Sequence, residues 1–371
     1  DYRSTSFVPI DVIIDNGVLP IDKTKVNTIG VIGPNADSRA ALIGNYHGTS
    51  SEYITVLEGI REEAGDDVRI LYSQGCNLYK DKVENLAWDQ DRISEAVITA
   101  ENSDVVILCV GLDETLEGEE GDTGNSDASG DKVDLHLPKV QEELIEKVTA
   151  VGKPTIVVLM AGSAIDLNYA QDNCNGILLA WYPGARGGRA VADLLFGKES
   201  PSGKLPVTFY KDLEGMPEFT DYSMKNRTYR YMEKEALYPF GYGLTYSDTC
   251  VTEAEVVGEV SAESDIMLKA TVKNNGTVDT DEVVQVYIKD LDSPLAVRNY
   301  SLCGFKRVSL KAGEEKSVEF TISNKAMNIV DEDGNRYIAG KHFRLFAGVS
   351  QPDTRSAELT GHKPAEVEIA L

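Results

Sequence analysis

The chain has 371 residues, of which 36 are Lys or Arg and 61 are Asp or Glu, so its formal net charge at pH 7 is −25. Nucleic acids and anionic membrane surfaces bind clustered Lys and Arg, so this balance excludes both classes of partner. The apolar runs are all far shorter than the roughly 20 residues of a membrane-spanning helix, and the length allows two domains, each with its own core.

The first half of the chain alternates short apolar runs with amphipathic stretches. Helical spacing of apolar side chains appears around residues 93–100, 140–148 and 190–195. Continuous apolar runs are expected of parallel strands that are buried on both faces. Such runs lie at residues 28–32, 68–72, 105–110, 156–161 and 177–181, and each is soon followed by a glycine. This rhythm predicts a doubly wound α/β sandwich over residues 24–210, after an N-terminal extension over residues 1–23.

The second half changes to a period of two. Alternating apolar residues recur near 266–272, 284–288, 318–322 and 343–347, and turn-forming residues separate them. This pattern predicts an antiparallel β-sandwich over residues 250–371. The segment 211–249 has little periodicity and is rich in Tyr, Pro and Gly, so we expect an ordered connector.

Cysteines and the first residues bear on the cellular compartment. The five cysteines are an odd number without CxxC spacing, and the four histidines show no metal-ligand spacing, so no zinc site is predicted. The opening residues lack the apolar core of a signal peptide. We therefore expect reduced cysteines and a cytoplasmic location, although a mature secreted chain would also have lost its leader.

The loop after the third apolar run is the most unusual segment of the chain. Crowded carboxylates raise one another's pKa, which is how a carboxylic acid remains protonated near neutral pH and serves as a general acid. A solvated acidic loop and a Ca²⁺ site are the alternatives, and an EF-hand is excluded because its ligand spacing does not occur. The carboxylates between residues 111 and 134 are Asp113, Glu114, Glu117, Glu119, Glu120, Asp122, Asp127, Asp131 and Asp134.

Several ordered motifs resemble glycoside hydrolase family 3, in its β-glucosidase and β-xylosidase branch. In the first half these are GNYHG at 44–48, EGEEGD at 117–122, LHLP at 135–138 and AWYPG at 180–184. SGKLPVTF at 202–209 and YPFGYGL at 238–244 follow. EVVQVY at 282–287 and LCGFKRV at 302–308 resemble the fibronectin-III-like domain that many members carry.

The resemblance implies a division of labour between three parts. A (β/α)₈ barrel carries the aspartate nucleophile, an α/β sandwich lends the general acid/base, and a fibronectin-III-like β-sandwich follows. This chain matches the second and third parts only, so the nucleophile is expected on a barrel domain or chain outside it. The implied substrate is a β-linked oligosaccharide or glycoside, with no cofactor and no metal, and homo-oligomerisation is left open.

The family's acid/base glutamate stands three positions before an aspartate, which here selects Glu119 with Asp122. The chain has Thr123 where members often have Arg, and the loop is longer, so Glu120 and Glu117 are rivals for the role. Asp122 and Glu120 are also the candidate substrate-binding residues. The competing hypothesis is a non-catalytic carbohydrate-binding or scaffolding module, in which the acidic loop is a solvated surface or a Ca²⁺ site.

Overall fold

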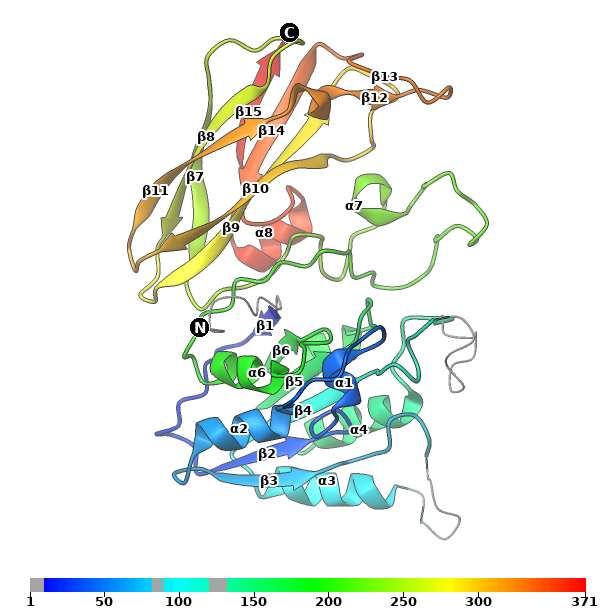
Figure 1. The fold of residues 1–371 in the computed structure, drawn as a ribbon, viewed down its shortest axis with the longest axis vertical. Coiled ribbons are helices and arrows are strands. Elements are labelled where there is room, and N and C mark those ends of the chain that lie inside the picture. The colour runs from blue at the N-terminus through cyan, green and yellow to red at the C-terminus, as the bar shows by residue number, and fades with distance from the viewer. Residues whose placement is uncertain (1–9, 82–87, 89, 120–131) are drawn as a thin grey trace. The chain divides into compact units, whose positions relative to one another are not determined.

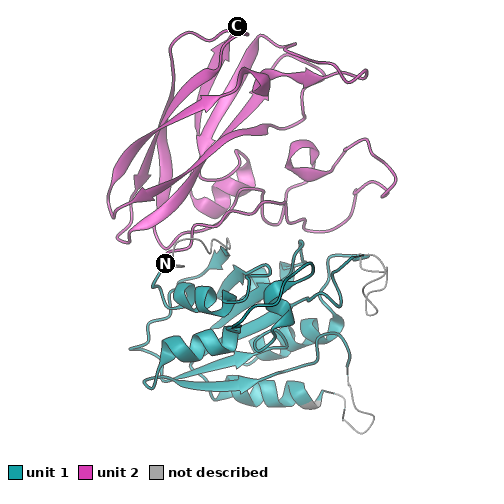
Figure 2. Ribbon diagram, viewed as in Figure 1, with its two compact units in different colours: residues 1–199 teal, residues 200–371 magenta. Residues whose placement is uncertain are grey.

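A computed structural model describes residues 10–81, 88, 90–119 and 132–371 of the chain (Figure 1). The chain divides into two compact units, Asp1–Glu199 and Ser200–Leu371 (Figure 2). Within the described residues, no helix has the length and apolar character needed to cross a membrane. All five cysteines are free, and burial raises the pKa of the Cys76 and Cys174 thiols to about 12.

Unit 1 is built on one six-stranded sheet with the order β1-β6-β5-β4-β2-β3. Strands β2 to β6 are parallel, and β1 pairs antiparallel with β6 at one edge. The strands are β1 (Asp11–Asp15), β2 (Thr28–Ile32), β3 (Arg69–Ser73), β4 (Val105–Gly111), β5 (Thr155–Met160) and β6 (Gly176–Leu179).

Helices connect the parallel strands and cover the sheet. Helix α2 packs against α6, and α3 packs against α4. Both β4 and β5 are buried along their whole length, which explains their continuous apolar sequences. The helices of unit 1 are α1 (Ala40–Ile43), α2 (Val56–Ala64), α3 (Asp91–Glu101), α4 (Lys139–Thr149), α5 (Asn168–Asn173) and α6 (Gly187–Leu195).

The N-terminal segment differs from the prediction of an extension over residues 1–23. Residues 11–15 are an edge strand of the sheet, and Ile10, Val12 and Ile13 are buried. This strand forms because its backbone pairs with that of β6, and a pairing over so long a sequence distance leaves no local sequence pattern. The boundary between the two units also differs, since it lies at 199/200 and the predicted connector 211–249 belongs to unit 2.

Unit 2 contains a β-sandwich of two antiparallel sheets, with strand orders β10-β9-β14-β15 and β11-β8-β7. Alternating side chains of both sheets meet in one apolar core that includes Val272, Val286, Phe320 and Phe343. Its seven sandwich strands are β7 (Thr249–Val257), β8 (Ile266–Asn274), β9 (Thr280–Asp290), β10 (Ser301–Leu310), β11 (Glu315–Ile322), β14 (His342–Gly348) and β15 (Ala365–Ala370).

The connector packs on the sandwich through aromatic rings. Tyr229 stacks on Phe240 with ring centroids 4.4 Å apart, and it meets the buried Tyr287 edge-on. The expected ordered connector is therefore part of the unit's own packing. The smaller elements of unit 2 are α7 (Thr228–Tyr231), η2 (Asn324–Met327), β12 (Ile329–Val330), β13 (Arg336–Tyr337) and α8 (Thr354–Thr360).

Candidate active site

The candidate site lies where the strand order of unit 1 reverses. Strands β2 and β4 are neighbours, but the chain continues from β2 to β3 on one side and from β4 to β5 and β6 on the other. In open α/β sheets, ligands bind beyond the carboxyl ends of the strands at such a switch point. The acidic loop starts at the end of β4, so the topology places it at this position.

The buried amide of Gln141 fixes the start of the acidic loop. Its Oε1 accepts a hydrogen bond from the Gly111 N–H at 2.8 Å, and its Nε2 donates to the Gly111 carbonyl at 2.8 Å. Asn35, which follows β2, donates from Nδ2 to the Leu112 carbonyl at 2.9 Å. The loop therefore leaves the sheet in one defined direction.

The first two carboxylates of the loop are held by neighbouring groups. Asp113 is buried and accepts hydrogen bonds from the Thr115 N–H at 2.9 Å and the Thr115 hydroxyl at 2.6 Å. Glu114 lies 3.1 Å from Nε2 of His47. The Gly48 carbonyl and Glu114 both raise the pKa of the His47 imidazole. These contacts hold both carboxylates against neighbouring groups of unit 1.

Glu117 is held more tightly than its neighbours. One carboxylate oxygen, Oε2, accepts hydrogen bonds from the Gly162 N–H and from the Tyr182 hydroxyl, both at 2.6 Å. Burial and the Glu117 charge raise the pKa of Tyr182, so its hydroxyl keeps its proton and remains a donor. Glu117 thus ties the acidic loop to the segments that follow β5 and β6.

A lysine lies on the far side of the same loop. The Lys132 ammonium donates to the Ala164 carbonyl at 2.7 Å, so it connects the end of the loop with the segment after β5. Burial lowers the pKa of Lys132, while the carboxylates of Glu117 and Asp134 oppose that shift. The described ends of the acidic loop are therefore both fastened to the carboxyl edge of the sheet.

Glu119 is exposed, whereas Asp113 is buried and Glu114 and Glu117 are partly buried. Asp134, at the far end of the loop, is also exposed. Its carboxylate accepts a hydrogen bond from the hydroxyl of Tyr46, a residue on the segment after α1. Tyr46 is 79% exposed and has a left-handed backbone with a φ of 57°. Non-glycine residues hold such conformations mainly where the surroundings enforce them, often at functional sites.

The structure separates the three candidate glutamates. Glu117 is an anchor, Glu119 is exposed, and Glu120 lies outside the described residues, as does Asp122. Among the residues that the structure describes, no group of three or more His, Cys, Asp or Glu side chains is placed to hold a metal ion.

Sequence reasoning missed the groups that hold the loop. Tyr182 appeared there only as a letter of the AWYPG motif, and its hydrogen-bond partner Glu117 is 65 residues away. Tyr46 and His47 appeared only as letters of the GNYHG motif. The available signal was that the acidic loop and AWYPG each directly follow a strand, which brings them to one edge of a parallel sheet. GNYHG follows α1 and gave no such signal.

The fold and site together define a doubly wound α/β domain with an acidic loop at the carboxyl edge of its sheet, followed by a β-sandwich. Residues 12–246 match the model of the glycosyl hydrolase family 3 C-terminal domain, and residues 282–351 match that of a fibronectin type III-like domain. The chain therefore belongs to glycosyl hydrolase family 3, which confirms the family and fold class predicted from the sequence.

Two curated relatives and one solved structure illustrate the similarity. A β-xylosidase from Formosa agariphila is 34% identical over 360 residues, covering 93% of this chain and 48% of that enzyme. A periplasmic β-glucosidase from Salmonella typhimurium is 30% identical, covering 91% and 47%. A β-glucosidase structure from Erythrobacter marinus has a TM-score of 0.80 at 30% identity, covering 98% and 49%. This chain thus spans about half the length of the relatives it matches.

Proposed function

We propose that this chain supplies the general acid/base of a retaining, exo-acting β-glycosidase, and that Glu119 has that role. The substrate class is a β-linked xyloside or glucoside, because the similar proteins are named β-xylosidases and β-glucosidases. The aspartate nucleophile resides on a (β/α)₈ barrel that the matched part of the relatives does not include. The observation that carries the proposal is the exposure of Glu119 at the carboxyl edge of the sheet.

The contacts of the other carboxylates in the described start of the loop, before residue 120, support this choice. Asp113 and Glu117 are bound by donors within unit 1, and Glu114 is paired with His47. A general acid must reach the leaving oxygen within hydrogen-bond distance, and a glutamate whose oxygen already accepts two short hydrogen bonds would first have to lose them. Among the residues that the structure describes, Glu119 has one hydrogen-bond partner, the Tyr46 hydroxyl, which can exchange donor and acceptor roles with it.

The mechanism needs two carboxyl groups on opposite sides of the scissile bond. In retaining glycosidases they stand about 5–5.5 Å apart. Glu119, protonated, gives its proton to the leaving oxygen while the barrel aspartate attacks the anomeric carbon. Glu119, now ionised, then takes a proton from the water that hydrolyses the glycosyl-enzyme. The Tyr46 hydroxyl stabilises this ionised form and directs the carboxylate between the two steps.

The test compares two glutamates two residues apart in the enzyme that contains both this chain and the barrel. Glu119→Gln keeps the shape of the side chain but cannot transfer a proton, so turnover of a disaccharide falls by roughly 10²–10⁴-fold. For a substrate with an activated phenol leaving group, the rate of the first step falls much less, because that leaving group needs little help from an acid. Glu117→Gln is the matched control, and it retains the wild-type dependence on the leaving group.

Full disaccharide activity in Glu119→Gln would reject the assignment. If no loop variant changes any rate and Ca²⁺ stabilises the chain, the non-catalytic module is the better description.

A further inference from the structure

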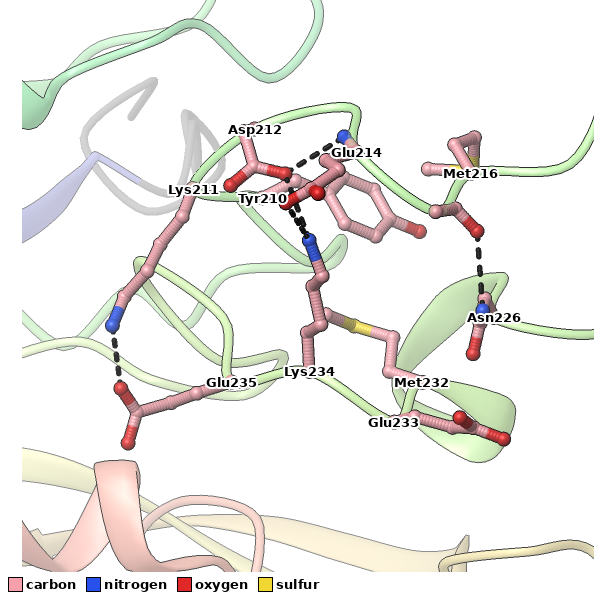
Figure 3. A pocket seen from close by; sticks show the side chains of 11 residues that line it. Tyr210, Lys211, Asp212, Glu214, Met216, Asn226, Met232, Glu233, Lys234 and Glu235 are labelled. Carbon is pink, nitrogen blue, oxygen red and sulfur yellow. Dashed lines mark hydrogen bonds and ion pairs between the residues drawn. The ribbon is translucent and has the colours of Figure 1, made fainter.

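A pocket of about 260 Å³ in unit 2 is explained by the folding of the connector itself (Figure 3). Its two lysines pair with carboxylates of the same segment, Lys234 with Glu214 at 2.7 Å and Lys211 with Glu235 at 2.5 Å. These ion pairs hold the two ends of the connector's loop together. The turn that follows β6 in unit 1 is different, because its contacts reach the acidic loop.

The turn after β6 directs two neighbouring aromatic side chains to different partners. The indole Nε1 of Trp181 donates to Oδ2 of Asp11, on the edge strand β1, at 2.9 Å. The hydroxyl of the next residue, Tyr182, donates to Oε2 of Glu117, in the acidic loop, at 2.6 Å. This single turn therefore connects the N-terminal strand with the start of the acidic loop.

The backbone of Trp181 is left-handed, with a φ of 55°. This conformation is unfavourable for a residue that carries a Cβ, and it persists where the surrounding contacts enforce it. The turn begins directly after the sheet, because the Ala180 N–H still donates to the Leu159 carbonyl of β5 at 2.8 Å. The hydrogen bond to Asp11 fixes the indole ring on one side of this turn.

Asp11 offers this contact from a position that water does not reach. Its exposed fraction is 0%, and the register of β1 and β6 fixes its place opposite Leu179. A buried carboxylate is unfavourable unless hydrogen-bond donors compensate for the water that it has lost. The indole N–H of Trp181 is such a donor, so Asp11 and Trp181 each stabilise the position of the other.

The ring of Tyr182 lies in a narrow slot between two glycines. A Cβ at Gly44 would lie 2.6 Å from Cδ2 of the ring, and a Cβ at Gly162 would lie 2.9 Å from Cε2. The slot therefore fits the ring in one orientation. A change in the backbone of Trp181 would turn the ring within this slot and move its hydroxyl away from Glu117.

We propose that Asp11 and Trp181 are positioning residues for the acid/base loop. They hold the turn after β6, the turn holds the Tyr182 hydroxyl on Glu117, and Glu117 fixes the loop two residues before Glu119. The expected effect on catalysis rests on the proposed function, whereas the expected effect on Glu117 does not.

Hydrogen exchange of the Gly162 amide tests the contact without any activity, because this amide donates to the same oxygen of Glu117 at 2.6 Å. In the full 371-residue chain, Trp181→Phe removes the indole N–H and Asp11→Leu removes its acceptor. We expect the exchange rate at Gly162, measured by NMR, to rise about tenfold in both variants. Asp11→Asn keeps an oxygen that can accept from the indole, so it should retain the wild-type rate.

The matched control is Trp88→Phe, because Trp88 is the other tryptophan of the chain and is 79% exposed. This variant should leave the exchange rate at Gly162 unchanged.

The rate test uses the enzyme that contains both this chain and the barrel. A displaced acid slows a reaction that needs its proton, so Trp181→Phe and Asp11→Leu should lower disaccharide turnover about tenfold. The rate of the first step with an activated phenol leaving group should change by less than about twofold. A variant that only weakens the fold would lower both rates by the same factor.

The inference is overturned if Gly162 keeps its wild-type exchange rate in Trp181→Phe and Asp11→Leu, or if Trp88→Phe raises that rate equally. It is also overturned if Asp11→Asn has the same effect as Asp11→Leu, or if both reaction rates fall by the same factor, because the pair would then support the fold alone. Full disaccharide activity in Glu119→Gln would instead reject the proposed function, and the Gly162 amide would then decide by itself whether Asp11 and Trp181 hold the loop.

Discussion

Oε2 of Glu117 accepts a 2.6 Å hydrogen bond from the hydroxyl of Tyr182, across 65 residues of sequence. The same oxygen accepts from the Gly162 N–H, so segments after three strands meet at one atom. This contact fixes the acidic loop while leaving Glu119, two residues further on, exposed. The loop therefore anchors one glutamate and leaves another exposed, as the proposed acid/base role of Glu119 requires.

Tyr182→Phe removes the hydroxyl and keeps the ring. Because Glu117 retains the Gly162 N–H, we expect a loss of about 1–2 kcal/mol in the free energy of unfolding, measured by urea denaturation. The matched control is Tyr169→Phe, whose hydroxyl contacts Thr149 at the surface. That variant should change stability by less than about 0.5 kcal/mol. Equal effects of the two variants would contradict the anchoring role.

Gly44 and Gly65 test how closely the GNYHG segment packs. Their backbones are nearly identical, with φ and ψ of 59° and −149° at Gly44 and of 62° and −150° at Gly65. A Cβ at Gly44 would lie 2.6 Å from Cδ2 of Tyr182, whereas one at Gly65 would meet nothing within 4 Å. Alanine at either site suffers the same backbone strain of about 1–3 kcal/mol.

The contact with Tyr182 should therefore add about 1–3 kcal/mol to the loss in Gly44→Ala alone. The comparison is made by denaturing both variants under identical conditions. If Gly65→Ala is as destabilising as Gly44→Ala, the segment does not pack on Tyr182 as described.

The His47–Glu114 contact makes a prediction about pH. The Gly48 carbonyl and Glu114 raise the pKa of His47 above its ordinary value. Protonated His47 therefore stabilises the folded chain. This stabilisation is complete below the pKa of His47 in the unfolded chain, near 6.5, and is lost as the pH rises through the higher pKa of His47 in the folded chain. In an NMR titration, Glu114→Gln should lower the pKa of His47, while Glu142→Gln, which faces His136, should leave it unchanged.

A buried ion pair in unit 2 gives a prediction on stability. Lys204 and Glu282 lie 2.8 Å apart, with side chains 8% and 2% exposed. Glu282 also accepts from the Thr249 hydroxyl at 2.5 Å. Lys204→Met leaves a buried carboxylate without its cation, so we expect a loss of about 3–5 kcal/mol in the unfolding free energy.

The exposed pair of Lys311 and Asp279 is the control for that measurement, because the same substitution there removes a salt bridge that water screens. Lys311→Met should lower the unfolding free energy far less than Lys204→Met does. The double variant Lys204→Met/Glu282→Leu should regain part of the loss. A Lys204→Met variant with wild-type stability would mean that the pair contributes nothing.

The sequence predicted those parts of the fold that local patterns specify. The apolar run 105–110 became β4, because a strand buried on both faces requires continuous apolar side chains. Strand β1 was missed, because its place depends on pairing with β6, more than 160 residues away. Its charged ends at Asp11 and Asp15 gave no apolar run to recognise.

The site was predictable as a loop and not as an arrangement of atoms. Motif spacing placed Glu117 and Glu119 in one acidic segment, but two glutamates among similar neighbours have equivalent sequence contexts. The difference between them comes from Tyr182 and Tyr46, which the topology brings from distant segments. Only the fold can therefore distinguish an anchoring carboxylate from an exposed one.

The most direct test of Glu119 as the acid/base is the product formed by Glu119→Gln in the presence of azide. In the barrel-containing enzyme, an activated aryl glycoside still forms the glycosyl-enzyme, but no base assists water in the second step. Azide attacks without a base, so the prediction is a rate that rises with azide concentration and a glycosyl azide of retained β configuration. If the Glu119→Gln variant released only free sugar, at a rate unaffected by azide, this result would contradict the assignment.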